Sequence, residues 1–290
     1  MFTKKHNRVA AIHDLSGFGR CSLSVILPVM SVMGVQVCPI PTAVLSTHTG
    51  GFGEVAKVDL TDYISETLNH YKKLKLQMDC VYTGYLGSVK QVLHCQEYFK
   101  YFERALKVVD PVMGDGGKLY HSFTQEMVDG ICKLVESADI ITPNMTEASI
   151  ILGEDMPTDR LTTADARKML AKLSSKGPKK VVVTGVVLAT GEYANICYDS
   201  ENATYWKSCS QHLPVSYPGT GDIFAAVLTA AIMCGDSLPM AVDRATRFVE
   251  LAIKTTYSYS TPTREGVMME EALKWLITSL SEIPQGYETL

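Results

Sequence analysis

The sequence predicts an α/β protein with a mostly parallel central sheet, helices on both faces of the sheet and a small antiparallel hairpin. Short apolar runs alternate with longer amphipathic stretches through most of the chain, which is the pattern of β-α-β units. Residues 181–184 form an uninterrupted β-branched run, typical of a strand buried on both faces. Residues 193–207 contain two alternating runs joined by a polar turn, which indicates the antiparallel hairpin.

The predicted elements follow one another with short connections. Strands are predicted at residues 8–12, 35–39, 80–82, 106–109, 140–142 and 181–184, and the hairpin strands at 193–198 and 203–207. Helices are predicted at residues 21–33, 60–74, 89–102 and 123–136, and the chain is expected to be helical from Gly219 almost to its end. No linker, repeat or low-complexity segment divides the chain, so residues 1–290 are predicted to form a single domain.

The composition excludes several classes of protein. With 46% hydrophobic and 20% charged residues, the chain has the make-up of a globular protein. Its 31 acidic and 27 basic residues give a net charge of −4, so we expect no nucleic-acid partner. No apolar stretch is long enough to span a membrane and no signal peptide is visible, which predicts a cytoplasmic protein without a membrane partner. The eight cysteines lack the spacing of a metal site and are expected to be free thiols.

Ligands of parallel α/β sheets bind at the carboxyl ends of the strands, so the loops that follow the strands are the candidate site. The strongest signal among them is Pro-Gly-Thr-Gly-Asp at 218–222, directly before a long apolar helix. Gly219 and Gly221 allow a ligand to approach the backbone, and the first amides of the helix attract an anion. Asp222 would then be a general base, although a carboxylate in the first helical turn also stabilises a helix without any catalytic role.

Two further acids follow predicted strands. Asp110 ends the strand at 106–109, and Pro111 then takes the chain out of regular structure. Glu147 closes the segment Thr-Pro-Asn-Met-Thr-Glu at 142–147. Each acid could attract Mg²⁺ that is bound to phosphates. The alternatives are a turn residue for Asp110, and for Glu147 a capping box completed with Asn144.

The loops after two other strands contain candidate substrate contacts. Thr49 lies in a Gly-rich loop after the second predicted strand, and Tyr85 lies in Thr-Gly-Tyr-Leu-Gly at 83–87. Tyr85 could stack on a flat substrate or simply pack in the core. Two nucleotide-binding motifs are incomplete, because Ser22 replaces the third glycine of a dinucleotide fingerprint and Leu119 follows the Gly-Lys of a would-be P-loop.

Together these motifs resemble the ribokinase superfamily and, within it, the pyridoxal (vitamin B6) kinase family, over nearly the whole chain. Gly-Thr-Gly-Asp at 219–222 resembles the superfamily's anion hole and catalytic base, and the segments 110–114 and 144–147 resemble its ATP and metal motifs. The pair Ser-Thr-His-Thr at 46–49 and Thr-Gly-Tyr-Leu-Gly-Ser at 83–88 resembles the loops that face the pyridine ring in the vitamin B6 kinases.

The resemblance implies a ribokinase-like kinase that uses ATP and Mg²⁺, and in some cases a monovalent cation, to phosphorylate a primary alcohol of a small heteroaromatic molecule. It also implies a homodimer. The residues implied are Asp222 with Gly219, Thr220 and Gly221 for catalysis; Asp14, Thr49, Tyr85 and Asp222 for the substrate; Asp110, Thr142, Asn144, Glu147 and Thr184 for ATP; and Asp110 and Glu147 for the metal.

The chain departs from the family at two of these positions. Asp14 stands where pyridoxal kinases commonly have Ser, and the Asp-Leu-Ser-Gly at 14–17 resembles a loop of hydroxymethylpyrimidine kinases. Thr184 stands where some vitamin B6 kinases have Lys. The sequence therefore leaves three functions open: a pyridoxal kinase, a kinase for hydroxymethylpyrimidine or a sugar, and a binding protein of the same fold that lacks activity.

Overall fold

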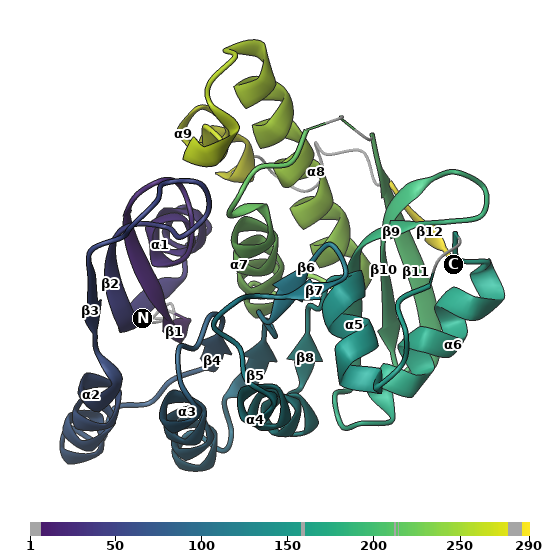
Figure 1. Cartoon of the computed structure of the whole chain (residues 1–290). Helices are drawn as coiled ribbons and strands as arrows, with labels where there is room; N and C mark the ends of the chain where they lie inside the picture. The colour runs from purple at the N-terminus through teal and green to yellow at the C-terminus, as the bar shows by residue number, and fades with distance from the viewer. Residues whose placement is uncertain (1–6, 158–159, 212, 214, 278–285) are drawn as a thin grey trace, which may run out of the picture.

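The computed structural model describes residues 7–157, 160–211, 213, 215–277 and 286–290. A large sheet runs through the molecule with helices on both faces, as the sequence predicts (Figure 1). Its strands are β1 (Arg8–Phe18), β2 (Gln36–Thr47), β3 (Lys57–Asp59), β4 (Cys80–Thr83), β5 (Leu106–Val109), β8 (Ile140–Ile141), β9 (Lys180–Val187), β10 (Tyr193–Asp199), β11 (Thr204–Ser210) and β12 (Tyr287–Thr289). The main helices are α1 (Leu23–Val32), α2 (Thr61–Lys73), α3 (Val89–Tyr101), α4 (Gln125–Glu136), α5 (Met145–Leu152), α6 (Thr163–Ser174), α7 (Thr220–Met233) and α8 (Leu238–Ser258).

The sheet order is β12-β11-β10-β9-β8-β5-β4-β1-β2-β3. The central strands from β9 to β2 are parallel, and antiparallel strands lie at each side. The β10–β11 hairpin pairs Tyr193 with Ser210 and Asp199 with Thr204, which confirms the predicted antiparallel hairpin. Because the central strands are parallel, their carboxyl ends all lie at one edge of the sheet.

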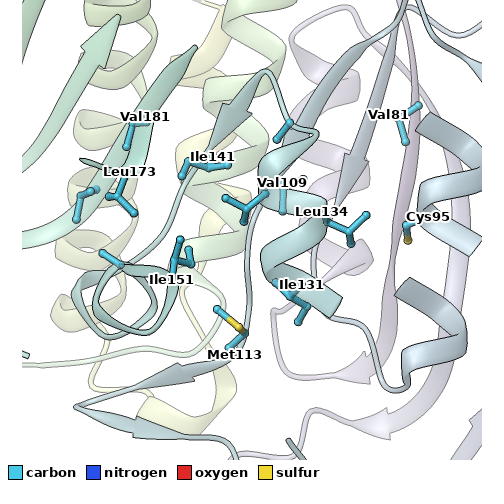
Figure 2. Packing of buried hydrophobic residues seen from close by; sticks show 14 of the residues in the cluster. Val81, Cys95, Val109, Met113, Ile131, Leu134, Ile141, Ile151, Leu173 and Val181 are labelled. Carbon is cyan, nitrogen blue, oxygen red and sulfur yellow. The ribbon is translucent and has the colours of Figure 1, made fainter. Parts of the chain in front are cut away.

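Each face of the sheet has its own apolar core. One core lies between the sheet and α2 to α6, and includes Val81, Val109, Ile131 and Leu173 (Figure 2). The other lies beneath α1, α7 and α8, where Phe224 and Phe248 pack against the opposite side of the strands. Residues 181–183 of β9 contribute to both cores, which explains the uninterrupted apolar run of this strand.

β1 and β2 are longer than predicted. β4 pairs with β1 only as far as Ile12 and Thr83, yet β1 continues beside β2 to the pair Phe18 and Thr47. Together with β3, these extensions form a flap beyond the edge of the parallel strands. The register of β1 against β2 shifts between His13 and Leu15, where the flap begins. The expectation that β1 ends at residue 12 is therefore wrong, because pairing with β2 holds a polar segment as a strand.

The C-terminal part also differs from the prediction. α7 and α8 confirm the helices expected after Gly219. Beyond them the described residues form short helical turns, α9 (Met269–Ala272) among them, and then β12, which pairs with β11. Part of the predicted helical stretch, residues 278–285, lies outside the described residues. The small hairpin β6 (Gly114–Asp115) and β7 (Lys118–Leu119) and the helix α6 were not predicted as elements, whereas the start of α5 is the capping box that the sequence offers as an alternative for Glu147.

Two further observations concern the described residues alone. The eight cysteines form no disulfide there, and Cys80, Cys95 and Cys197 are buried, in agreement with free thiols. No described helix combines the length and the apolar character needed to cross a bilayer.

Candidate active site

The predicted site residues come from loops that meet at the carboxyl edge of the sheet. Hydrogen bonds join the ends of neighbouring strands there: the Gly84 amide donates to Ile12, the Asp110 amide to Thr83 and the Thr142 amide to Val109. These bonds place the loops after β1, β4, β5 and β8 side by side. The N-terminus of α7 faces the same edge, because Asp222 contacts His13 and Ser22.

Gly219 forms a tight turn at the start of α7. Its φ angle is 80°, in the left-handed region that favours glycine, and a Cβ atom there would lie 2.0 Å from the Arg20 carbonyl oxygen. Gly219, the residue that precedes α7, has no side chain to cap the first amides of the helix, and Gly221 has open space where a side chain would be. Thr220 turns its hydroxyl back to the Tyr217 carbonyl, 3.0 Å away. The helix therefore presents free N–H groups and the positive end of its dipole to an anion.

Asp222 is held in the first turn of α7 by contacts with the β1–α1 segment. Its Oδ2 accepts a hydrogen bond of 2.6 Å from the Ser22 amide, and its Oδ1 lies 3.2 Å from His13 Nε2. The side chain is 13% exposed, so ligands can still reach the carboxylate. This position combines a fixed proton acceptor with an adjacent anion site.

His13, which the sequence analysis did not select, connects Asp222 to Asp14. His13 Nδ1 lies 2.8 Å from Asp14 Oδ1, and the Asp14 carboxylate also accepts hydrogen bonds from the hydroxyls of Ser22 and Ser16. Burial alone would lower the pKa of His13, but the charges of Asp222 and Asp14 and hydrogen bonds with both raise it to about 10. Burial pushes the pKa of Asp14 upward, yet the contacts with His13, Ser22 and Ser16 lower it overall.

Asp110 lies at the end of β5, where it is buried. The Thr142 hydroxyl donates to Asp110 Oδ1 over 3.1 Å. Burial, followed by the negative charge of Asp222, raises the pKa of Asp110 to about 7. A carboxylate in this state gains from a nearby cation.

Asn144 and Glu147 form the capping box that the sequence analysis weighed as an alternative. The Asn144 side chain accepts from the Glu147 amide, and Glu147 Oε2 accepts from the Asn144 amide, both over 2.9 Å. Glu147 Oε1 also accepts from the Met113 amide. Burial, and then the charge of Asp110, raise the pKa of Glu147 well above its ordinary value. Glu147 therefore has a structural role, and it is close enough to Asp110 for the two carboxylates to repel each other.

The remaining predicted residues surround this centre. Thr184 pairs with Asn144 across the ends of β9 and β8, which brings two of the predicted ATP residues together. Tyr85 is half-buried and meets Phe123 edge to face, with ring centroids 6.1 Å apart. Thr49 is exposed in the loop after β2. A contact of Tyr85, Thr49 or Asp14 with substrate stays a prediction.

The fold and the site together define a small-molecule kinase with a ribokinase-like fold. The family model described as phosphomethylpyrimidine kinase matches residues 27–266, and the chain belongs to this family.

Several relatives extend this comparison. A pyridoxal kinase from Bos taurus is 30% identical over 231 residues, which cover 69% of each chain. The crystal structure of pyridoxal kinase from Lactobacillus plantarum is 33% identical with a TM-score of 0.84, and the match covers 94% of this chain and 96% of that one. A provisionally named phosphomethylpyrimidine kinase from Bacteroides thetaiotaomicron, crystallised with pyridoxal, is 42% identical with a TM-score of 0.93, covering 99% of this chain and 100% of that one.

Proposed function

We propose that this protein transfers the γ-phosphate of ATP to the 5′-hydroxymethyl group of pyridoxal, and of pyridoxine and pyridoxamine as well, to give pyridoxal 5′-phosphate and its analogues. The observation that carries the proposal is the Asp222 carboxylate, fixed beside the uncapped N-terminus of α7. The pyridoxal in the 42% identical relative supports the choice of substrate.

The chemistry requires a base and a site for negative charge. A hydroxymethyl group is a weak nucleophile at neutral pH, so Asp222 accepts its proton as the oxygen attacks the γ-phosphate. The backbone amides of the Gly219–Thr220–Gly221 turn stabilise the charge that develops on the phosphoryl oxygens. Because these groups are already in place, little reorganisation is needed during the transfer.

Asp110 and Glu147 are the residues that we propose to hold Mg²⁺, together with the phosphates of ATP. Both are oxygen donors of the kind that Mg²⁺ prefers. Burial raises the pKa of each, as does a neighbouring negative charge, that of Asp222 for Asp110 and that of Asp110 for Glu147, and a cation would offset these effects. When bound, the ion would neutralise phosphate charge. Thr142, Asn144 and Thr184 lie beside these acids and are proposed to contact ATP. We include a monovalent cation in this proposal, as an activator of the kinase.

Asp14, Thr49 and Tyr85 are proposed to border the ring of the substrate. Three side chains already donate to the Asp14 carboxylate. It therefore has little remaining capacity for the amino group of an aminopyrimidine, which favours pyridoxal over hydroxymethylpyrimidine.

A substrate panel tests the proposal. The purified protein is incubated with MgATP and one of four alcohols: pyridoxal, pyridoxine, pyridoxamine or hydroxymethylpyrimidine. We expect phosphorylation of the three vitamers with kcat/KM at least about tenfold above that of the pyrimidine, since unpaired polar groups cost about 1–3 kcal/mol. A preference for the pyrimidine would reassign the substrate, and tight pyridoxal binding without turnover would indicate a protein without activity.

Two further parts of the proposal follow from the resemblance, for the homodimer, and from the composition, for the location and the absent partners. The protein is proposed to be a cytoplasmic homodimer that needs neither a nucleic acid nor a membrane. One chain has a mass of 31.8 kDa, and sedimentation at micromolar concentration should give about twice this value. Cell fractionation should recover the protein with the cytosol.

A further inference from the structure

We propose that His13 is a positioning residue for Asp222: the imidazole, anchored by Asp14, fixes the Asp222 carboxylate beside the turn that binds the phosphate. This inference rests on the proposed role of Asp222 as the base. It assigns a function to His13, whose ring is buried and lies stacked against Tyr82.

The geometry of the ring supports this role. Nδ1 and Nε2 each face a carboxylate oxygen, of Asp14 at 2.8 Å and of Asp222 at 3.2 Å. The Asp14 amide donates to Nδ1 over 2.9 Å when Nδ1 is unprotonated, whereas in the protonated ring Nδ1 donates to Asp14 Oδ1; in either form Nε2 can donate to Asp222. An imidazolium ion satisfies both carboxylates at once, and links a buried anchor to the group that acts on substrate.

The surrounding structure is shaped to hold the ring. A Cβ atom on Gly84 would lie 1.9 Å from His13 Cδ2, so the absence of a side chain at residue 84 provides the space for the imidazole. On the other side Asp14 is itself held by Ser16 and Ser22. Since the Ser22 amide also binds Asp222 Oδ2, both oxygens of Asp222 are fixed from the β1–α1 segment. Removing the His13 contact leaves Asp222 free to rotate about the remaining bond.

The charge of His13 also bears on the base. Two carboxylates contact His13, Asp14 on β1 and Asp222 on α7, and Asp110 after β5 acts on it at longer range. The ring of Tyr82 on β4 lies 6.4 Å from the His13 ring, and the Cys21 thiol interacts with Asp222. Three of these five are carboxylates. A positive charge on His13 attracts the Asp222 carboxylate in addition to the hydrogen bond between them, which strengthens the contact that holds the base in place.

Two amide variants separate positioning from general stability. In His13→Asn the amide nitrogen takes the place of Nδ1 and reaches Asp14 only, whereas in His13→Gln it takes the place of Nε2 and can still donate to Asp222. We expect His13→Asn to lower kcat by about 10- to 100-fold with KM for pyridoxal and for ATP changed less than about threefold, and His13→Gln to recover most of the loss. His94→Asn, at another largely buried histidine but on α3, is the matched control and should leave kcat unchanged.

Two readouts distinguish positioning from a structural effect. In an Asp222→Asn background, His13→Asn should cause no further loss of kcat, because His13 acts through the Asp222 carboxylate. Both His13 variants lack the positive charge, so the low-pH limb of kcat/KM should move to higher pH by about one unit. If His13→Asn does not fold, the pH profile of His13→Gln provides the test.

The outcomes divide as follows. Equal losses in His13→Asn and His13→Gln with an unmoved pH limb, or a further loss in the Asp222→Asn background, would show that the ring is only structural. Normal kcat and an unmoved pH limb in both variants would also overturn the inference. Normal turnover by Asp222→Asn alone would instead overturn the proposed function, so the two failures can be told apart.

Discussion

Single residues of the site depend on one another through charge. Asp14, Asp110 and Asp222 share the field of one histidine, and Asp110 in turn acts on Glu147. A substitution at any of them therefore changes the electrostatic environment of the others. The effects of such substitutions on activity should not be additive.

Asp222→Asn removes the proton acceptor but keeps its shape. We expect kcat to fall by about 10²- to 10⁴-fold, because general-base catalysis contributes on that scale, while KM changes far less. A residue that only stabilises the start of α7 would instead cost about 1 kcal/mol of unfolding free energy and leave kcat near normal. Measuring kcat and urea unfolding on the same preparation decides between the two roles.

Glu147→Gln separates the metal role from the capping box. Glutamine also completes a capping box, so the protein should still fold, but its single side-chain oxygen can accept from only one of the two amides that Glu147 binds, and the melting temperature should fall modestly. The Mg²⁺ concentration needed for half-maximal activity should rise by about tenfold or more, since changes to residues that bind a metal or orient its ligands have effects of that size. If the Mg²⁺ titration matches that of the unmodified protein, Glu147 is a capping residue only.

Tyr85→Ala tests whether Tyr85 borders the substrate ring. Loss of stacking affects one substrate, so KM for pyridoxal should rise by about three- to tenfold while KM for ATP stays constant. Equal changes in both constants would assign Tyr85 to packing against Phe123.

At the scale of elements, the Gly219–Thr220–Gly221 turn at the start of α7 contains two glycines with different constraints. Gly219→Ala places a Cβ atom against the Arg20 carbonyl at a positive φ, and should cost about 1–3 kcal/mol of stability. Gly221→Ala meets no protein atom and lies inside the helix, so stability should be unchanged or about 0.5–1 kcal/mol higher.

The activity of Gly221→Ala then reports on the phosphate alone. The added methyl group occupies the open space before the free amides, so kcat/KM for ATP should fall by about tenfold or more. A stable and fully active Gly221→Ala enzyme would show that the phosphate binds elsewhere.

The elements also show what the sequence can and cannot reveal. Strands buried on both faces, such as β9, are visible as apolar runs, and the Gly-rich turn before α7 is visible as a motif. The continuation of β1 through Asp14 and Ser16 is not visible, because its stability comes from pairing with β2 rather than from apolar residues. The contact of His13 with Asp222 joins residues 209 positions apart, and no local pattern predicts it.

At the scale of the whole molecule, the buried ionisable groups predict how stability depends on pH. Asp110 and Glu147 have raised pKa values in the folded state, so the folded protein binds more protons than the unfolded chain. Their contribution to the free energy of unfolding is present near pH 4. For Asp110 it is lost as the pH rises through about 7. The contribution of His13 to the free energy of unfolding is complete below its ordinary pKa of 6.5 and is lost as the pH rises towards 10.

Without nucleotide and metal, the protein should therefore lose stability from pH 5 to pH 9, by about 1 kcal/mol or more each for Asp110 and His13. Urea unfolding at pH 5, 7 and 9 measures this loss. Asp110→Asn should flatten the part between pH 5 and 7, and Glu103→Gln, at an exposed carboxylate, should not. A stability that rises between pH 5 and 7 would contradict the prediction.

The hydrogen bond between the Ser22 amide and Asp222 spans 200 residues. A ribosome that adds about 5–20 residues per second needs on the order of 10 to 40 s to make the chain between them. During that interval β1, β4 and β5 can pair, but the face of the sheet that α7 and α8 cover stays exposed at Ala11, Tyr82 and Val108. The nascent protein thus passes through a stage with an uncovered apolar surface and no assembled active site. Once α7 is synthesised, it begins to cover this surface and brings Asp222 to the site.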